Sequence, residues 1–290
     1  MISKILMISS LTALMSFTGL AKKDDKPAYK IYNSEGKEVD YSDVVKELSK
    51  KEVNFFGELH NNPIAHWLQL QLTKDFYESK KEKLVLAAEM FEADDQIIMD
   101  EYLEGKISEK SFKDEAKLWP NYETDYKPLV EFAKLNKLAF VCANVPRRYA
   151  SIVYRSGLEK LDSLDAEGKA DIAPLPIEYD GNVNCYKQML EGAGGHGGDN
   201  LPKAQAIKDA SMAWFISKAM KTDGMVFHFN GSYHSDNGEG IIWYLKKYKP
   251  EVKIGTITTV LQSDVNKLAD ENKGKADFII VVPEDMTTTH

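Results

Sequence analysis

Two short segments of the chain repeat the pattern Gly-x-x-His. One is Gly57-Glu58-Leu59-His60 and the other is Gly231-Ser232-Tyr233-His234. Each follows an apolar run with the composition of a buried β-strand, so each places a histidine just beyond a strand end. A glycine at such a position lets the backbone turn tightly or approach a ligand closely. The recurrence predicts one site to which both segments contribute.

Other polar side chains stand in the same place relative to further apolar runs. Glu89 follows one such run, and Asn144 follows another, with Arg147 and Arg148 just beyond it. For each residue alone, helix capping or simple exposure to solvent is an adequate explanation. A cluster of histidines, carboxylates and an amide is costly to bury unless it binds something, so together they indicate a functional site.

The residue types in this cluster suit a divalent metal. Neutral imidazoles with one or two carboxylates are the ligands of zinc and related ions that keep a position open for substrate. Glu58, His60 and His234 are the predicted metal ligands, and Glu89 is the predicted general base or the partner that orients a ligand. On this hypothesis these four residues are the catalytic residues of a metal-dependent hydrolase.

The elements that position these residues are strands buried on both faces. The apolar runs are continuous rather than alternating, which is typical of an α/β fold with a mostly parallel central sheet flanked by helices on both faces. In such sheets ligands bind beyond the carboxyl ends of the strands. A short amino-terminal hairpin is expected over 29–41. Strands are expected at 53–57, 84–88, 138–143, 225–230, 254–260 and 278–282, and helices at 42–50, 61–80, 94–104, 108–117, 125–136, 146–160, 201–222 and 238–248.

The first 21 residues have the features of a secretory signal peptide. One early charge, Lys4, precedes an uncharged stretch, and small residues before the end of Gly19-Leu20-Ala21 suit a cleavage site. The stretch is shorter than a membrane-spanning helix needs to be. No cysteine follows Ala21 to carry a lipid anchor. The expectation is an exported protein of the periplasm or cell envelope, with one domain over 28–290.

Charge and cysteine content bear on the partners and the disulfides that the protein can have. The formal net charge of −8 argues against nucleic acid as a partner. Two cysteines exclude a disulfide framework but allow one bridge, and the apolar surroundings of Cys142 favour a buried free thiol over pairing with Cys185. The glycine-rich segment 192–198 is either a plain flexible loop or a flap that carries His196 to a ligand.

At these residues the chain resembles the ChaN-like haem-binding uptake proteins, part of the superfamily that includes the TIKI and TraB proteins and erythromycin-esterase-like enzymes. The paired Gly-x-x-His segments and the glutamate at the second strand end carry the resemblance. The matching segments are FFGELHNNPIAHWLQLQL at 55–72, AAEMFE at 87–92, YKPLVEFAKLNKLAFVCANVPRR at 126–148, PKAQAIKDASMAWFI at 202–216 and FNGSYHSDNGEG at 229–240.

The resemblance implies haem binding, a part in iron acquisition at the cell envelope, a tyrosine phenolate on the iron and a homodimer that encloses the haem. A phenolate suits ferric haem. Tyr149 and Tyr154 are the first candidates, and Tyr233 is a third. Basic side chains are suited to the propionate groups of haem, because they form strong hydrogen bonds with carboxylates. The other residues assigned to haem binding are Arg147, Arg148, Asn144 and the Gln205 and Asp209 pair, which the resemblance favours over a capped, solvated helix face.

Three functions follow from these observations. The first is haem binding for uptake, which the resemblance favours. The second is metal-dependent hydrolysis, which is the better match to the chemistry of the strand-end residues. The third is an envelope scaffold or chaperone that keeps a relic of the site.

Overall fold

The computed structural model describes residues 26–192 and 198–290. The predicted signal peptide at 1–21 and the predicted flap residue His196 lie outside the described residues. Within the described ranges, no helix combines the length and the apolar character that crossing a membrane requires.

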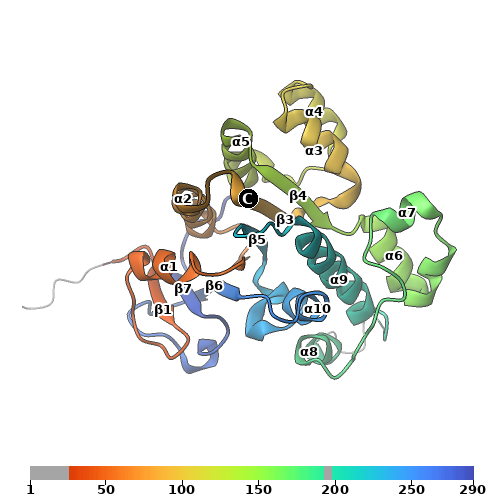
Figure 1. Cartoon of the computed structure of the whole chain (residues 1–290). Coiled ribbons are helices and arrows are strands. Elements are labelled where there is room, and N and C mark those ends of the chain that lie inside the picture. Colours follow the sequence, from red (N-terminus) through yellow and green to blue (C-terminus); the bar gives the residue numbers. More distant parts are fainter. Residues whose placement is uncertain (1–25, 193–197) are drawn as a thin grey trace, which may run out of the picture.

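A seven-stranded sheet forms the centre of the protein (Figure 1), in the order β1-β7-β6-β2-β5-β3-β4. Only β1 runs antiparallel to its neighbour, β7, and the other described pairings are parallel. The prediction of a mostly parallel α/β sheet is therefore confirmed. The strands are β1 (Lys30–Asn33), β2 (Val53–Glu58), β3 (Leu84–Glu92), β4 (Ala139–Asn144), β5 (Met225–Gly231), β6 (Ile254–Gln262) and β7 (Phe278–Pro283).

The predicted amino-terminal hairpin forms only in part. A single bridge joins Tyr32 to Glu38, and Val39 N donates to Ile31 O at 2.9 Å. The four residues of β1 pair instead along β7. The returning chain enters a helix at Tyr41, so it is too short to form a full second strand.

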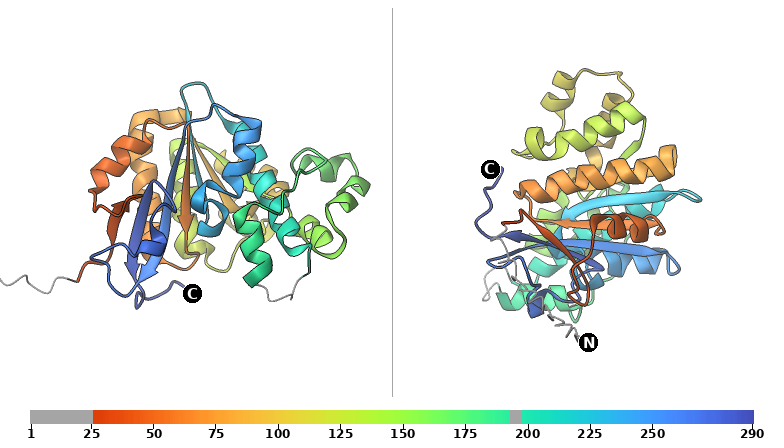
Figure 2. Two further views of the ribbon diagram at one scale, coloured as in Figure 1. Left: turned by 90° about the horizontal axis from the view of Figure 1, so that it is seen from below. Right: turned by 90° about the vertical axis from the view of Figure 1, so that its left-hand side faces the viewer.

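Helices cover both faces of the sheet (Figure 2). Adjacent residues of β2 point to opposite sides because side chains alternate along a strand: Phe56 packs with Leu68 in one apolar cluster and Phe55 with Ile207 in another. On the first face lie α1 (Tyr41–Leu48), α2 (Pro63–Lys80), α3 (Gln96–Leu103), α4 (Glu109–Glu115) and α5 (Lys127–Asn136). On the second lie α6 (Arg147–Ser156), α8 (Asn184–Gly192), α9 (Leu201–Ala219) and α10 (Ile241–Tyr248), with α7 (Ala166–Ala170) beside α6.

The sequence pattern did not predict α7 and α8. Five residues are too few to show a helical period, and α8 buries only Cys185 and Tyr186 of its nine residues. Both cysteines are buried free thiols, so the prediction for Cys142 is confirmed.

The strand β3 is longer than predicted because it contains a bulge. Its pairing with β4 changes register between Ala88 and Glu92, which are aligned with Cys142 and Asn144. A bulge re-aims the side chains within it. Here Glu89 lies inside the bulge, at the end of the sheet where the strands β2 and β5 also stop.

Candidate functional site

Four neighbouring strands bring the predicted site residues to one edge of the sheet. The strands β2, β5, β3 and β4 are adjacent in that order. Gly57 is aligned with Asn230 and Glu58 with Gly231, so the two Gly-x-x-His segments leave the sheet side by side. Residues more than 170 positions apart in sequence therefore meet because the strands are parallel.

Glu58 is a buried carboxylate that holds His60 in place. Its Oε1 accepts hydrogen bonds from Tyr126 at 2.8 Å and from Nδ1 of His60 at 2.9 Å, and its Oε2 accepts one from Gln69 at 2.5 Å. An ionised carboxylate only accepts hydrogen bonds, so Nδ1 of His60 carries the proton. The other ring nitrogen, Nε2, lies toward Gly231 and remains available for chemistry.

The charge around His60 favours its protonated form. Burial lowers the pKa of His60, but the hydrogen bond that His60 donates to Glu58 and the charges of Glu89 and Glu58 outweigh burial and raise this pKa above its ordinary value. The ring also meets the Trp119 indole edge to face, with centroids 4.9 Å apart. His60 is therefore a base whose strength depends on Glu58.

A second polar network lies behind this pair. His66 is 3.1 Å from Oε1 of Gln69 and 3.4 Å from Oδ2 of Asp125. Asn121 and Thr289 both donate hydrogen bonds to the same Asp125 oxygen, at 2.6 and 2.7 Å. Sequence reasoning missed these residues. Only the spacing of His66 and Gln69 on one face of α2, among apolar residues, could have indicated them.

His234 is enclosed by two carboxylates. Nε2 lies 3.1 Å from Oε1 of Glu89, and Nδ1 lies 2.5 Å from Oδ1 of Asp209. Glu89 also accepts a hydrogen bond from the backbone N–H of Gly231 at 2.7 Å, and Tyr186 donates one to Asp209 at 2.7 Å. Each ring nitrogen of His234 therefore faces a carboxylate oxygen, which suits a doubly protonated ring. The side-chain nitrogen of Gln205 lies close to both ring nitrogens, at 3.1 and 2.9 Å.

The electrostatics of this buried group agree with that arrangement. Burial lowers the pKa of His234, but Glu89 and Asp209 raise it to about 10. Burial likewise opposes ionisation of Glu89, yet the His234 cation holds the pKa of Glu89 well below its usual range. Burial raises the pKa of Asp209, although both its oxygens accept hydrogen bonds, which is the pattern of an ionised carboxylate.

The two glycines of the repeated pattern are sterically required. A Cβ at Gly57 would lie 2.9 Å from the Cα of Ser232, which is backbone of the other segment. A Cβ at Gly231 would lie 2.7 Å from Nε2 of His60. Glycine is therefore required for a different reason at each position. At Gly57 it allows two backbone segments to approach closely, and at Gly231 it leaves space for the His60 imidazole.

These contacts predict different effects of alanine at the two positions. Gly57→Ala should lower the free energy of unfolding by about 1–3 kcal/mol, because backbone cannot move aside as a side chain can. Gly231→Ala should displace the His60 ring from Glu58 and return the pKa of His60 toward its ordinary value. Denaturant titration and NMR titration of the imidazole measure the two effects. Gly192→Ala is the control, since its Cβ would meet nothing within 4 Å; equal losses of stability in all three variants would contradict the prediction.

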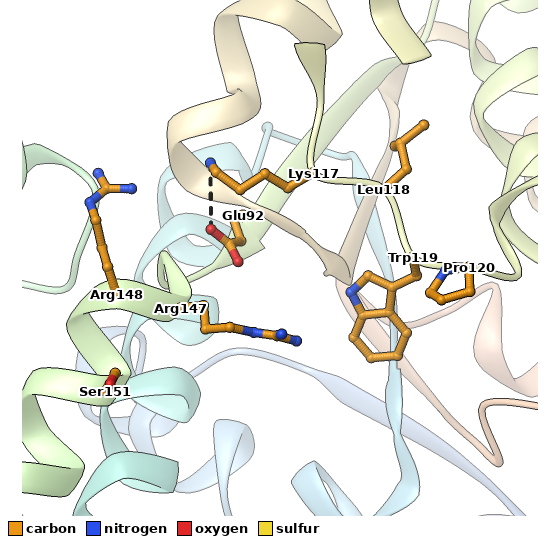
Figure 3. Close-up of a pocket in the computed structure, with 8 residues that line it drawn as sticks. All are labelled: Glu92, Lys117, Leu118, Trp119, Pro120, Arg147, Arg148 and Ser151. Atoms are coloured by element: carbon orange, nitrogen blue, oxygen red, sulfur yellow. Dashed lines mark ion pairs between the residues drawn. The ribbon is translucent and has the colours of Figure 1, made fainter. Parts of the chain in front are cut away.

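Three cavities adjoin this edge of the sheet. One, of about 450 Å³, is lined by both Gly-x-x-His segments and by His290. A second, of about 550 Å³, shares His60 and Gln205 with it. The third, of about 720 Å³ (Figure 3), shares Trp119 and Arg147 with the second. Together they form a cleft along this edge of the sheet, and His60 lines two of the three cavities.

The residues assigned to haem binding divide into two groups. Asn144, Arg147, Tyr154 and Gln205 line the second cavity. The remaining three do not line it: Arg148 forms ion pairs with Asp94 and Asp171, Tyr149 is buried against Arg148 and Gly168, and Asp209 is buried behind His234.

Further residues of the second cavity were missed by sequence reasoning. They include Trp119 from the loop after α4, and Leu201, Ala204 and Lys208 from α9. Lys208 lies one helical turn beyond Ala204, so the face of α9 that carries Gln205 could have indicated it.

The donor set does not offer a preformed metal centre. Among residues 26–192 and 198–290, no three His, Cys, Asp or Glu side chains are grouped so as to hold a metal ion. Both oxygens of Glu58 accept hydrogen bonds from protein donors, and both nitrogens of His234 face carboxylates. Of the side-chain nitrogens and oxygens of these three residues, only Nε2 of His60 has no polar partner in the part of the chain that the structure describes. The assignment of Glu58, His60 and His234 as metal ligands therefore stays a prediction.

One family model matches most of the chain. The family profile described as "Haem-binding uptake, Tiki superfamily, ChaN" matches residues 44–245. A solved structure titled as cofacial heme binding to ChaN of Campylobacter jejuni superposes with a TM-score of 0.66 at 17% identity, covering 88% of this chain and 96% of that one. An erythromycin esterase mutant in an open conformation gives a TM-score of 0.47 at 10% identity, covering 89% and 83%. At these identities the structural likeness concerns the fold. A search among curated proteins found no match.

Proposed function

Because the chain belongs to the haem-binding uptake family of ChaN type in the Tiki superfamily, we propose that it binds haem and takes part in haem or iron uptake. Export to the periplasm or cell envelope, expected from residues 1–21, is part of the same proposal. So is a homodimer that encloses the haem. Envelope transport components are the expected partners.

The observation that carries the proposal is the position of Tyr154. Its side chain is 45% exposed, lines the cavity of about 550 Å³, and its hydroxyl has no hydrogen-bond partner among the described residues. A phenolate oxygen is a ligand of ferric haem. The other two candidates fit less well: the Tyr233 hydroxyl donates to the Cys185 carbonyl, and Tyr149 is buried.

The surroundings of Tyr154 suit a large, mostly apolar ligand. Trp119, Val145, Leu201 and Ala204 provide apolar walls, and the volume lies within the range usual for pockets that bury small-molecule ligands. Haem would supply the iron that the tyrosine oxygen binds, while the chain supplies the walls and the polar groups that orient the ligand.

Titration of the purified protein with ferric haem tests this function. The expected result is a saturable shift of the Soret band at one haem per chain. Sedimentation with and without haem measures the dimer. A Soret band that remains that of free haem throughout the titration would rule the proposal out.

A second function, hydrolysis, is favoured by one observation. Glu58 and His60 form a carboxylate–imidazole pair, Nε2 makes no hydrogen bond with a described residue, and His60 lines the cleft, which is the arrangement of an oriented general base. The metal-dependent form of this hypothesis requires an ion at His60, and metal analysis of the freshly purified protein tests for it.

The pair predicts how hydrolysis would depend on pH. A general base must be unprotonated, so the rate on an activated ester should rise with pH through the raised pKa of His60. Glu58→Gln removes the charge that raises this pKa, so the rise should move to lower pH, whereas His60→Ala should abolish it. An unchanged pH profile in Glu58→Gln, with the fold intact by circular dichroism, would exclude His60 as the base.

A further inference from the structure

Two cations without carboxylate partners face the same cavity. Arg147 at the start of α6 and Lys208 in α9 both line the cavity of about 550 Å³. Across the described part of the chain, neither has a carboxylate oxygen within 4.0 Å. Figure 3 shows the Arg147 side chain extending toward Trp119. Two like charges held beside one cavity repel each other, so an anion placed between them is stabilised by both.

Neighbouring basic side chains are neutralised. Lys117 lies 2.7 Å from Asp94, 3.1 Å from Asp95 and 3.5 Å from Glu92. Arg148 also pairs with Asp94 and points away from Trp119 in Figure 3. Arg147 and Lys208 therefore differ from these two neighbours, because neither has a carboxylate within 4.0 Å among the described residues.

The side chain of Asn144 is independent evidence that this cavity binds a ligand. The residue is only 9% exposed, lines the same cavity, and its Oδ1 is buried without a hydrogen-bond partner. Its side chain makes no hydrogen bond with any described residue. A buried amide without partners destabilises a protein, so such groups in native proteins usually meet a ligand or water.

The backbone adds to the preference for an anion. The helix α6 begins at Arg147 after Pro146, and no side chain caps its first N–H groups. The start of a helix carries partial positive charge and free N–H donors. Asn144, Arg147 and this helix start lie within four residues of one another, with Lys208 facing them from α9.

We infer that Asn144, Arg147 and Lys208 form a subsite for the carboxylate groups of a large organic anion. The apolar residues Val145 and Leu201 line the same cavity, so the anion that fills it carries an apolar body. A compact inorganic anion would leave those walls in contact with water. The inference rests on the proposed function, in which the carboxylates are the propionates of haem.

Esterified and free porphyrins test the subsite without relying on iron. Binding of iron-free protoporphyrin and of its dimethyl ester is measured by fluorescence titration of the full chain. The wild type is expected to prefer the free acid at least tenfold. Arg147→Gln and Lys208→Gln should each lose most of this preference, while Arg148→Gln, whose cation is already paired, should keep it. Inorganic phosphate at millimolar concentration should not displace the porphyrin.

The possible results separate the two proposals. Equal affinity for acid and ester in the wild type, or an equal loss in Arg148→Gln and Arg147→Gln, would overturn the subsite. Displacement by phosphate would show a general anion site and would also overturn it. A preference for the acid without a Soret shift in the ferric haem titration would overturn haem ligation and leave the carboxylate subsite standing.

Discussion

Tyr154→Phe is expected to lower the affinity for ferric haem at least tenfold, which is about 1.4 kcal/mol, and to remove the spectrum of a phenolate-bound iron. The change deletes one oxygen atom and keeps the ring against the cavity wall. Because the hydroxyl of Tyr154 has no hydrogen-bond partner in ranges 26–192 and 198–290, the variant loses no hydrogen bond there, and its stability should stay unchanged. Soret titration and thermal unfolding measure the two quantities.

Tyr233→Phe is the matched control. Tyr233 is similarly exposed, at 40% against 45%, but its hydroxyl donates to the Cys185 carbonyl. This variant should lose a little stability and retain the haem spectrum. If Tyr233→Phe abolished the spectrum and Tyr154→Phe did not, the iron ligand would be Tyr233 and the assignment of the cavity would be wrong.

His234→Leu is expected to lower the free energy of unfolding by about 3–5 kcal/mol, because it removes one partner of a buried charge group and leaves the others uncompensated. Glu89 and Asp209 would then be two buried carboxylates without a cation between them. The exposed His290 lines the neighbouring cavity, so His290→Leu serves as the control and should change stability by less than about 0.5 kcal/mol.

The pH dependence of stability has a definite sign. The folded pKa of His234, about 10, lies above its unfolded value of 6.5, so its contribution is fully present below pH 6.5 and is lost as pH rises toward 10. The folded pKa of Glu89 is lowered, so its contribution is present above its unfolded value of 4.5 and is lost on acidification. Maximum stability is expected between these limits.

Denaturant unfolding at pH 5, 7 and 9 measures this dependence. The wild type should lose stability from pH 7 to 9, and His234→Leu should lack this loss. The variant should instead gain stability relative to the wild type on acidification, because its unpaired carboxylates take up protons. Parallel pH curves for the two proteins would show that His234 is not charged in the folded state.

Groups of both signs line the cleft. Glu89 and Glu92 line the cavity of about 550 Å³ together with Arg147 and Lys208. Glu89 is paired with His234 and Glu92 lies 3.5 Å from Lys117, whereas Arg147 and Lys208 have no carboxylate within 4.0 Å among the described residues. A ligand that carries carboxylates would therefore find its unpaired charges at Arg147 and Lys208.

Several features of the protein follow from the sequence alone. Continuous apolar runs predicted a parallel sheet, and parallel strands necessarily bring their carboxyl ends together, so the meeting of the two Gly-x-x-His segments beside Glu89 could be foreseen. Local patterns of this kind depend on neighbours in sequence. The start of α2 is local in the same sense, because Asn62 just before Pro63 accepts from Ala65 N at 3.0 Å.

Other features were decided by partners that are distant in sequence. Arg147 and Arg148 are equally good candidates in the sequence. In the structure, Asp94 and Asp171 form ion pairs with Arg148 and leave Arg147 unpaired among the described residues. The sequence predicts His234 as a metal ligand, but in the structure its Nδ1 is hydrogen-bonded to Asp209 from helix α9. Burial and pairing depend on which surfaces meet, and a hydrophobic pattern does not specify those contacts at the level of single polar atoms. The sequence therefore determined where the site lies, and the tertiary structure decided which of its charges are free to bind.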